Sequence, residues 1–513
     1  MVKPRLARVD AALFAFAALI GAVHLTTPFG REHALTAYVA RAWLHGATPY
    51  RATLSFDAPG LVGLHAFLAL LGNHGAVPLR VAALLAVLAV GALAPLVALP
   101  RGTTLAPGVR GLAACGASLF AHGYFDFWTS GRGGVFVAAA LLGAAAALLR
   151  DRHALRGPLV AGALLGVALT LRTAAFPFVP LLLGVAFTDP AGGAQRARRV
   201  GLVLAGGGVA IAFALLPIAA GGGLSDAHDL LWSARCVFLG EPRWETFGAA
   251  LFSARLWATY EPVTSPLAFV FLAGALRAAL QRDAAAFGRA VFVAGFALAS
   301  VVSLAVVGSS DLSEPELLVG LVALVVASVA HEIARMFPQA VKRAHALFLA
   351  QCIFFYAISC WEIWTPPAVY GLRWRALARR VTGRYDQRAY LATFDARALG
   401  FFPAEQWELA AWLRANTGPG DNILVRGYEP GLYLFAGRRY EGRFFTTAQL
   451  TWPNCAYKRG AWLAQDRDDL ARTRPRVVIA IAGAPGLDGE ESVRSEGYEV
   501  RFRTAHFVAL APR

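Results

Sequence analysis

Long apolar stretches separated by short polar turns fill the first two thirds of the chain. Many of them approach the roughly 20 residues that a helix needs to cross the hydrocarbon core of a bilayer. The apolar stretches lie at 11–28, 79–99, 108–123, 132–149, 157–172, 173–187, 198–219, 264–281, 288–307, 315–334 and 345–364. The pattern predicts an α-helical polytopic membrane protein with about eleven transmembrane helices.

The segment between the first two predicted spans has a different pattern. Residues 32–44 are amphipathic with a helical period, and residues 60–72 form an apolar run that contains His65. That run has roughly a dozen residues, too few to span a bilayer. We therefore expect the first outer loop, residues 26–78, to form two helices that lie along the membrane surface. Loops of this length are usually functional.

The last part of the chain loses the long apolar stretches. A helical pattern covers residues 404–416, with Pro403 near its first turn. Strand patterns follow at 422–426, 477–482, 498–504 and 506–510. The sequence predicts a transmembrane domain over residues 1–372, which includes the outer loop 26–78, and a small soluble α/β domain over residues 373–513.

Composition and charge agree with this division and orient it. Hydrophobic residues make up 57% of the chain and charged residues 16%, too few charges for an ordinary soluble domain. The net charge of +16 sits largely in short loops, such as those with Arg150 and Arg198. Basic loops of this kind stay on the cytoplasmic side and give no reason to expect nucleic acid as a partner. We expect a multi-pass protein of the cytoplasmic (inner) membrane, with its N-terminus inside and its C-terminal domain outside.

The sequence gives no sign of a metal site or an organic cofactor. The cysteines lack the C-x-x-C spacing of zinc and redox sites, and a disulfide between Cys236 and Cys455 stays open. Asp466, Asp468 and Asp469 form a string that could chelate a metal-bound diphosphate. Because no predicted strand precedes it, we expect a solvated helix face instead.

Two acidic residues of the first outer loop are candidates for catalysis. Glu32 and Asp57 belong to a loop that follows the bilayer closely, where a desolvated carboxylate is costly. Such a carboxylate can act as a general base that takes a proton from an attacking hydroxyl or amine. Both side chains could instead simply face water at the interface.

The sequence of this loop is similar to that of a known enzyme family. Residues 32–50 read EHALTAYVARAWLHGATPY and are followed by FDAPGL. They resemble the first periplasmic loop of glycosyltransferases with the C-type membrane fold, including aminoarabinose and protein mannosyl transferases. Two later segments extend the resemblance: ALLGVALTLRTAAFPFVPLLL and AAWLRANTGPGDNILVRGYEPGLYLFAGRR. The resemblance implies transfer of a sugar from a polyprenyl-phosphate carrier to a lipid, glycan or protein acceptor in the cell envelope.

The Pro-Tyr turn that ends at Tyr50 aligns the two loops. Glu32 then falls on the catalytic aspartate of the family and His33 on the glutamate that follows it. Asp57 stands where the family often has a lysine, and Ala58 replaces a proline. The resemblance thus implies that an acidic residue of this loop is the general base, and it leaves open whether Glu32 or Asp57 has that role.

The donor's phosphate would need a cationic partner in the membrane domain. Arg172 ends an apolar stretch at its predicted outer end, where a guanidinium could bind a lipid-linked phosphate through two hydrogen bonds. Arg132, at the start of another stretch, is a second candidate. Arg172 could instead extend to the lipid headgroups.

Other functions are compatible with a chain of many spans and an external domain. A transporter or flippase usually has two related halves, and we find no such repeat. A catalytically inactive relative that acts as a scaffold stays possible because of the change at Asp57. A membrane glycosyltransferase is the function that the sequence favours.

Overall fold

The computed structural model describes residues 4–71, 75–124, 127, 131–150, 155–188, 193–239, 261–307, 317–336, 366–451 and 458–513. The chain divides into two compact units that each combine segments distant in sequence. Unit 1 comprises Met1–Leu25, Leu79–Ala214 and Pro242–Gly371, and unit 2 comprises Thr26–Pro78, Leu215–Glu241 and Leu372–Arg513. The predicted span at 345–364 lies outside the described residues.

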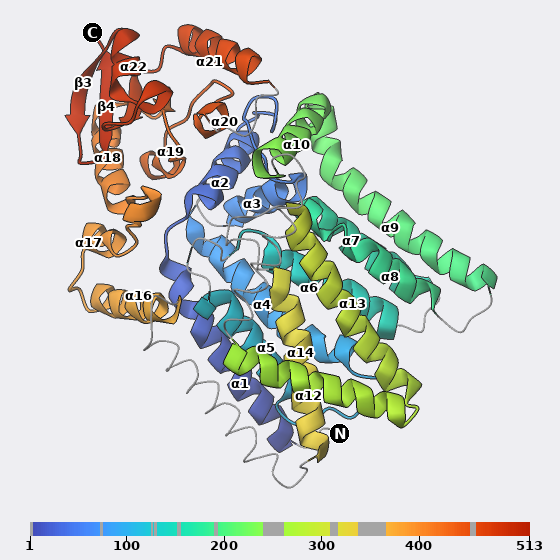
Figure 1. Cartoon of the computed structure of the whole chain (residues 1–513). Helices are drawn as coiled ribbons and strands as arrows, with labels where there is room; N and C mark the ends of the chain where they lie inside the picture. The colour runs from blue at the N-terminus through green and yellow to red at the C-terminus, as the bar shows by residue number, and fades with distance from the viewer. Residues whose placement is uncertain are drawn as a thin grey trace. The chain divides into compact units, whose positions relative to one another are not determined.

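The apolar helices fall on the predicted apolar stretches (Figure 1). They are α1 (Pro4–Ala22), α4 (Ala76–Ala98), α5 (Val109–Ser118), α6 (Gly134–Arg150), α7 (Arg156–Leu171), α8 (Phe178–Phe187), α9 (Gly193–Ala220), α12 (Glu261–Leu280), α13 (Ala284–Val307) and α14 (Leu318–Met336). Within the described residues, 5 helices are long and apolar enough to cross a membrane, and several shorter apolar helices accompany them. The predicted class, a helical polytopic membrane protein, is confirmed.

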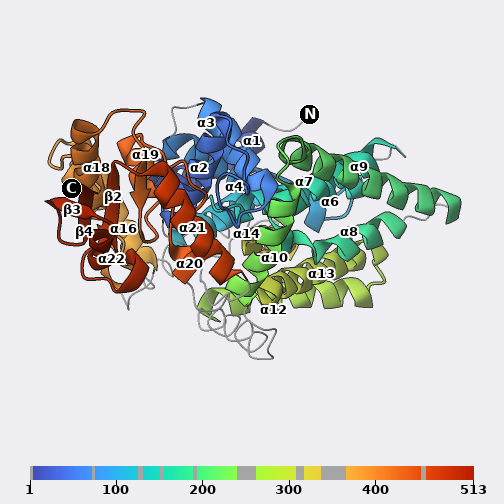
Figure 2. The same ribbon diagram turned by 90° about the horizontal axis from the view of Figure 1, so that it is seen from above.

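Small residues bring the helices of unit 1 close together. A Cβ added to Gly162 of α7 would lie 2.0 Å from the carbonyl oxygen of Val203 in α9. A Cβ on Gly91 of α4 would lie 2.3 Å from the Cα of Ala114 in α5. Elsewhere in the same unit, α13 lies alongside α8 (Figures 1 and 2). Such close approach is typical of helices that pack in membranes, where dispersion contacts replace the hydrophobic effect.

The C-terminal part of unit 2 is an α/β domain, as predicted. Its helices are α16 (Pro366–Val381), α17 (Gln387–Ala392), α18 (Pro403–Asn416), α19 (Gly431–Ala436), α20 (Ala448–Thr451), α21 (Arg459–Thr473) and α22 (Glu490–Ser495). Its strands are β1 (Ile423–Val425), β2 (Val477–Ile481), β3 (Tyr498–Arg503) and β4 (Phe507–Pro512), in the order β1-β2-β4-β3. The β1 strand pairs with β2 in parallel, and the other pairs are antiparallel.

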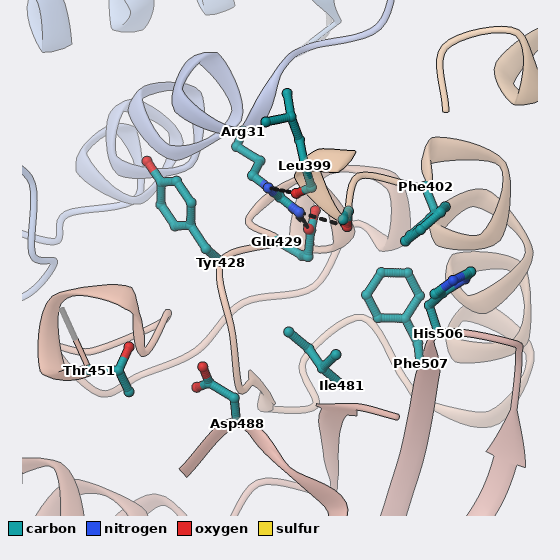
Figure 3. A pocket seen from close by; sticks show the side chains of 11 residues that line it. Arg31, Leu399, Phe402, Tyr428, Glu429, Thr451, Ile481, Asp488, His506 and Phe507 are labelled. Atoms are coloured by element: carbon teal, nitrogen blue, oxygen red, sulfur yellow. Dashed lines mark hydrogen bonds and ion pairs between the residues drawn. The ribbon is translucent and has the colours of Figure 1, made fainter. Parts of the chain in front are cut away.

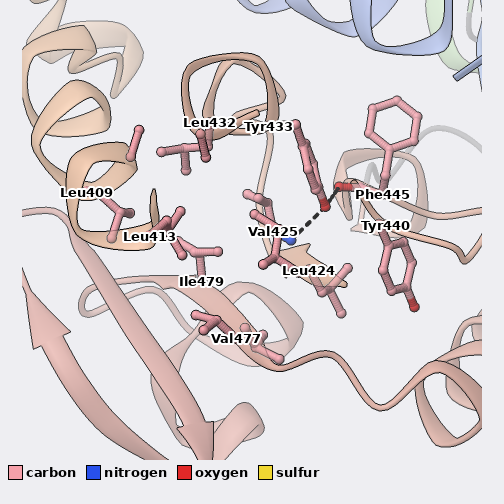
Figure 4. Packing of buried hydrophobic residues seen from close by; sticks show 14 of the residues in the cluster. Leu409, Leu413, Leu424, Val425, Leu432, Tyr433, Tyr440, Phe445, Val477 and Ile479 are labelled. Carbon is pink, nitrogen blue, oxygen red and sulfur yellow. Dashed lines mark hydrogen bonds between the residues drawn. The ribbon is translucent and has the colours of Figure 1, made fainter. Parts of the chain in front are cut away.

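The first outer loop folds onto this domain through α2 (Arg31–Leu44). Tyr38 of α2 is buried in the same hydrophobic core as Leu409, Val425 and Val478. The hydroxyl of Tyr38 donates to the carbonyl oxygen of Tyr440 at 3.1 Å and accepts from its backbone N–H at 2.8 Å. Figure 4 shows the part of this core that lies between α18 and the strands. The apolar face of α2 is thus buried against the C-terminal domain.

The second helix of the first outer loop, α3 (Pro59–Leu71), keeps apolar side chains exposed. Phe67, Leu70 and Leu71 are between 58% and 71% exposed. The helix has 13 residues, so it is too short to span. The exposed apolar side chains agree with a helix at the membrane interface.

The segment Leu215–Glu241 also belongs to unit 2. Two carboxylates near the start of α10 (Leu224–Leu239) pair with the C-terminal domain. Asp226 lies 3.1 Å from Arg443, and Asp229 lies 2.6 Å from Lys458. The α10 helix is therefore joined to the C-terminal domain by charge as well as by apolar packing.

The expectation of a solvated face for the aspartate string is wrong at Asp466. Asp466 lies on α21 and is 1% exposed. Its Oδ2 accepts a hydrogen bond from Nη1 of the buried Arg426 at 2.7 Å. Asp469 is partly buried and accepts a hydrogen bond from the backbone N–H of Arg443 at 2.9 Å, so only Asp468 faces solvent as expected. The partners of Asp466 and Asp469 are distant in sequence, and the local pattern does not show them.

Candidate functional site

The first turn of α2 carries Glu32, the residue aligned with the catalytic aspartate. The helix begins after Gly30, and the Glu32 side chain is half-buried. A carboxylate in this turn is favoured by the positive end of the helix dipole. The hydroxyl of Thr36, one turn later, lies 3.0 Å from the backbone carbonyl oxygen of Glu32 and 2.5 Å from Oδ2 of Asp57. The structure therefore brings the segments of the two predicted acidic residues together at one hydroxyl.

The turn that leads from α2 to Asp57 is held by Tyr50. Tyr50 is buried and has a φ of 69°, in the left-handed region that residues other than glycine rarely adopt. Its backbone N–H donates to the carbonyl oxygen of Thr53 at 2.9 Å. Its hydroxyl donates to the backbone carbonyl oxygen of Asp57 at 2.6 Å. Burial and the nearby Asp57 carboxylate raise the pKa of Tyr50, so its hydroxyl stays protonated. Tyr50 thus holds the backbone at Asp57 in place.

His33, the residue beside Glu32, is turned inward. It is 1% exposed and stacks on Phe29, with ring centroids 6.3 Å apart and planes inclined by 14°. Phe29 also approaches His65 of α3, with 6.5 Å between centroids. Where the family has a second acidic residue, this chain therefore packs an aromatic cluster at the start of the loop.

The residue before Glu32 is anchored to the C-terminal domain. Arg31 donates from Nε to Oε1 of Glu429 at 2.7 Å, and from its terminal nitrogens to the carbonyl oxygens of Leu399 and Gly400 at 2.6 and 2.7 Å. These groups line one side of a pocket of about 340 Å³ in unit 2 (Figure 3). The pocket is lined by Arg31, Leu399, Gly400, Phe402, Tyr428, Glu429, Thr451, Ile481, Asp488, His506 and Phe507.

Glu429 is the buried member of this ion pair. It is 2% exposed, and Gln406 of α18 donates to its second oxygen. Burial raises the pKa of the Glu429 carboxyl from 4.5 to about 7, against the opposing effects of Arg31 and Gln406. Because the folded state has the higher pKa, deprotonation of Glu429 lowers the free energy of unfolding as pH rises from 4.5 to about 7. The ion pair with Arg31 is therefore fully formed only above about pH 7.

The arginines predicted to bind phosphate belong to unit 1. Arg172 follows the last residue of α7 and has an extended backbone. Arg132 lies in the turn before α6, between two glycines with positive φ. A Cβ on the first of them, Gly131, would lie 3.4 Å from Leu79 at the start of α4. The turn with Arg132 thus packs against the first turns of α4.

Sequence reasoning missed an arginine beside that turn. Arg80 is the one charged residue among the 23 residues of α4 and is 1% exposed. Its Nη2 donates to the carbonyl oxygen of Phe127 at 2.9 Å, in the segment that leads to Arg132. A lone charge in an apolar helix was the signal that could have identified it, because such residues usually have a function.

The described residues include no group of three or more His, Cys, Asp or Glu side chains that could hold a metal ion. Cys115 lies buried in α5, and its thiol donates to the carbonyl oxygen of Leu13 at 3.3 Å. The side chains of Cys236 and Cys455 lie outside the described residues, so their pairing stays open.

Comparison with known proteins identifies the fold. No family model matches the sequence, and no curated protein sequence does. Among solved structures, ArnT from Cupriavidus metallidurans bound to undecaprenyl phosphate matches with a TM-score of 0.53 and 15% identity, over 98% of this chain and 97% of that one. The chain has the glycosyltransferase C-type fold. The archaeal oligosaccharyltransferase AglB from Archaeoglobus fulgidus, in complex with an inhibitory peptide and a dolichol-phosphate, matches with a TM-score of 0.50 and 12% identity, over 92% of this chain and 69% of that one.

The structural likeness to ArnT confirms the glycosyltransferase C-type fold that the sequence of the first outer loop indicated. It extends over nearly the whole length of ArnT, so membrane helices and C-terminal domain match together. Both solved structures contain a lipid phosphate, which is a property of those proteins. At this level of identity the likeness concerns the fold, and the chemistry depends on the residues of this chain.

Proposed function

We propose that this protein is a membrane glycosyltransferase that moves a sugar from a polyprenyl-phosphate carrier to an acceptor on the outer face of the membrane. The observation that carries the proposal is the match to ArnT over 98% of this chain and 97% of that one. The experiment that tests it measures whether the protein releases free polyprenyl phosphate from a polyprenyl-phosphate sugar.

The acidic residues of the first outer loop supply the base. The carboxylate of Glu32 removes the proton of an acceptor hydroxyl or amine as that group attacks the anomeric carbon of the sugar. The bond between the anomeric carbon and the phosphate oxygen breaks, and the electron pair leaves with the polyprenyl phosphate. Asp57 is the alternative base, since Thr36 joins both segments.

Arginines of unit 1 bind the phosphate of the donor. Arg172 and Arg132 both occur where a predicted span meets the outer surface, and Arg80 lies beside the turn of Arg132. A guanidinium matches phosphate oxygens with two parallel hydrogen bonds, and the negative charge compensates a cation held in an apolar surrounding. We assign no step of the reaction to a metal ion.

We also propose where the protein is located. It is a multi-pass protein of the cytoplasmic membrane, whose helices lie among the membrane lipids. Its N-terminus is inside and its C-terminal domain is outside. Its acceptor is then a lipid, glycan or protein of the cell envelope. The basic loops support this orientation, because the positive-inside tendency puts them in the cytoplasm.

Substitution of Arg172 tests the phosphate site. Arg172→Ala should weaken binding of undecaprenyl phosphate at least tenfold, because the charged hydrogen bonds to the phosphate are lost. Arg172→Lys should restore only part of the affinity, since a lysine keeps the charge without the fork. The measurement is a titration of undecaprenyl phosphate followed by native mass spectrometry of the protein in detergent.

Two further variants are measured in the same titration. Arg80→Gln should weaken binding as well. Arg198→Ala is a control, because Arg198 is exposed in the second turn of α9, at the end that we place on the cytoplasmic side. Equal affinity in Arg172→Ala and in the parent would leave lipid-headgroup contact as the role of Arg172.

A further inference from the structure

The contacts of Arg31 join the candidate catalytic loop to distant parts of the chain. Every polar contact described above for Arg31 is to a residue at least 368 positions later in the sequence. The guanidinium also lies 5.7 Å from the centroid of the Phe401 ring. One side chain thus connects the first turn of α2 to two segments of the C-terminal domain. It precedes Glu32 directly.

The partner of Arg31 is itself rigidly held. Glu429 is buried, and its second oxygen is bound by Gln406. Just after it, α19 approaches both neighbours closely: a Cβ on Gly431 would lie 2.9 Å from Oε1 of Gln406 and 3.9 Å from the Cβ of Ala34 in α2. The start of α19 therefore packs against the same first turn of α2 that Arg31 anchors.

We propose that Glu429 is a positioning residue, which fixes Arg31 and through it the first turn of α2 that carries Glu32. This inference rests on the proposed function, and it adds a role for the C-terminal domain in catalysis. A general base has to be held within a fraction of an ångström of its productive position, because a displacement of about 1 Å can cost about 100-fold in rate. The buried ion pair supplies that constraint from outside the loop.

The arrangement also makes the constraint dependent on pH. Burial raises the pKa of Glu429 and Arg31 opposes this effect, so protonation favours the departure of Arg31 from a carboxyl that itself stays buried. The first turn of α2 therefore becomes looser below about pH 7, although global unfolding, which hydrates Glu429, becomes more costly there. Other charged groups near Glu429 are Asp488 and His506 across the pocket, and Glu405, which binds His506 at 2.7 Å. A variant at His506 is therefore compared with Glu429→Gln.

The test uses the full-length protein with Glu429→Gln, which keeps the shape and the contact to Gln406 but not the charge. We expect kcat to fall roughly 10- to 100-fold with KM nearly unchanged. The loss of rate of the parent below about pH 7 should disappear, because the variant resembles the protonated form at every pH. His506→Gln should keep that pH dependence.

A second readout needs no turnover. Hydrogen exchange of a peptide covering residues 30–38 should become about tenfold faster in Glu429→Gln, because local opening of the first turn costs less. The matched control is Glu408→Gln, which removes an exposed ion pair with Arg388 and should leave exchange and kcat unchanged. If Glu429→Gln does not fold, Arg31→Lys, which keeps the charge but loses the fork, provides the same readouts.

The two readouts separate this inference from the proposed function. Normal turnover, unchanged exchange and an unchanged pH profile in Glu429→Gln would overturn the positioning role alone. If the parent turns over no polyprenyl-phosphate sugar, the proposed function fails, and exchange at residues 30–38 still shows whether Glu429 fixes α2.

Discussion

Glu32→Gln should lower turnover by about 10²- to 10⁴-fold while binding of the lipid donor survives. Glutamine keeps the shape of the side chain but cannot accept the proton of the acceptor. Glu32→Asp should keep measurable activity, because the resembling family uses the shorter acid at this position. The measurement is the initial rate of polyprenyl phosphate release by full-length variants in liposomes.

Asp57→Asn decides which acid is the base. If Glu32 is the base, Asp57→Asn should have a smaller effect, through the hydrogen bond from Thr36. Glu441→Gln, a change at an exposed carboxylate of unit 2, is the control and should leave the rate unchanged. Parental turnover in Glu32→Gln together with an inactive Asp57→Asn would assign the base to Asp57.

Asp466→Ala should destabilise the protein by about 3–5 kcal/mol, because it leaves the buried guanidinium of Arg426 without its charge partner. Both side chains of this pair are 2% exposed. Thermal unfolding of the full chain in detergent, followed by tryptophan fluorescence, measures the loss as a lower Tm.

Two further variants test whether the loss of stability comes from the buried pair. Asp468→Ala lies on the same helix but faces solvent, so we expect a change within about 0.5 kcal/mol. A double variant with Asp466→Ala and Arg426→Met should recover part of the stability, since no buried charge is left unpaired. An Asp466→Ala protein as stable as Asp468→Ala would contradict the importance of the pair.

The periodic parts of the fold could be predicted from the sequence. Apolar runs locate α4, α9 and α13, because helices that face lipid are apolar over most of their surface. The strands β1 and β2 were also found from their runs of branched residues. These elements are determined by local sequence, and so a local pattern is enough to find them.

Contacts between distant segments could not be predicted in the same way. An amphipathic pattern shows that α2 buries one face, but it does not show that Tyr38 packs beside Tyr433 of the C-terminal domain. The same limit applies to the pairs Arg31–Glu429 and Arg426–Asp466. In each pair the partners meet only in the folded chain, and one of them looks like an ordinary surface charge in the sequence.

The candidate site was partly visible in the sequence. The motif around Tyr50 pointed to Glu32 and Asp57, and the structure adds Thr36 as the residue that links their segments. A single threonine within a helical pattern carries no signal by which it could be singled out from the sequence. Arg80 does carry a signal, because it is the single charge of its helix, but it lies outside the segments that resemble the family.

The central claim is transfer of a sugar from a lipid phosphate. The most direct test uses polyprenyl-phosphate hexoses and pentoses with a radiolabelled sugar as donors. Each donor is incubated with the protein in liposomes, and envelope lipids, glycans and proteins are added as acceptors. The measurement follows the label and the released polyprenyl phosphate. We predict that at least one donor yields free polyprenyl phosphate and a labelled acceptor in equal amounts, and that Glu32→Gln greatly slows both. Failure to transfer label from any donor, or movement of intact donor across the bilayer without cleavage, would contradict the account.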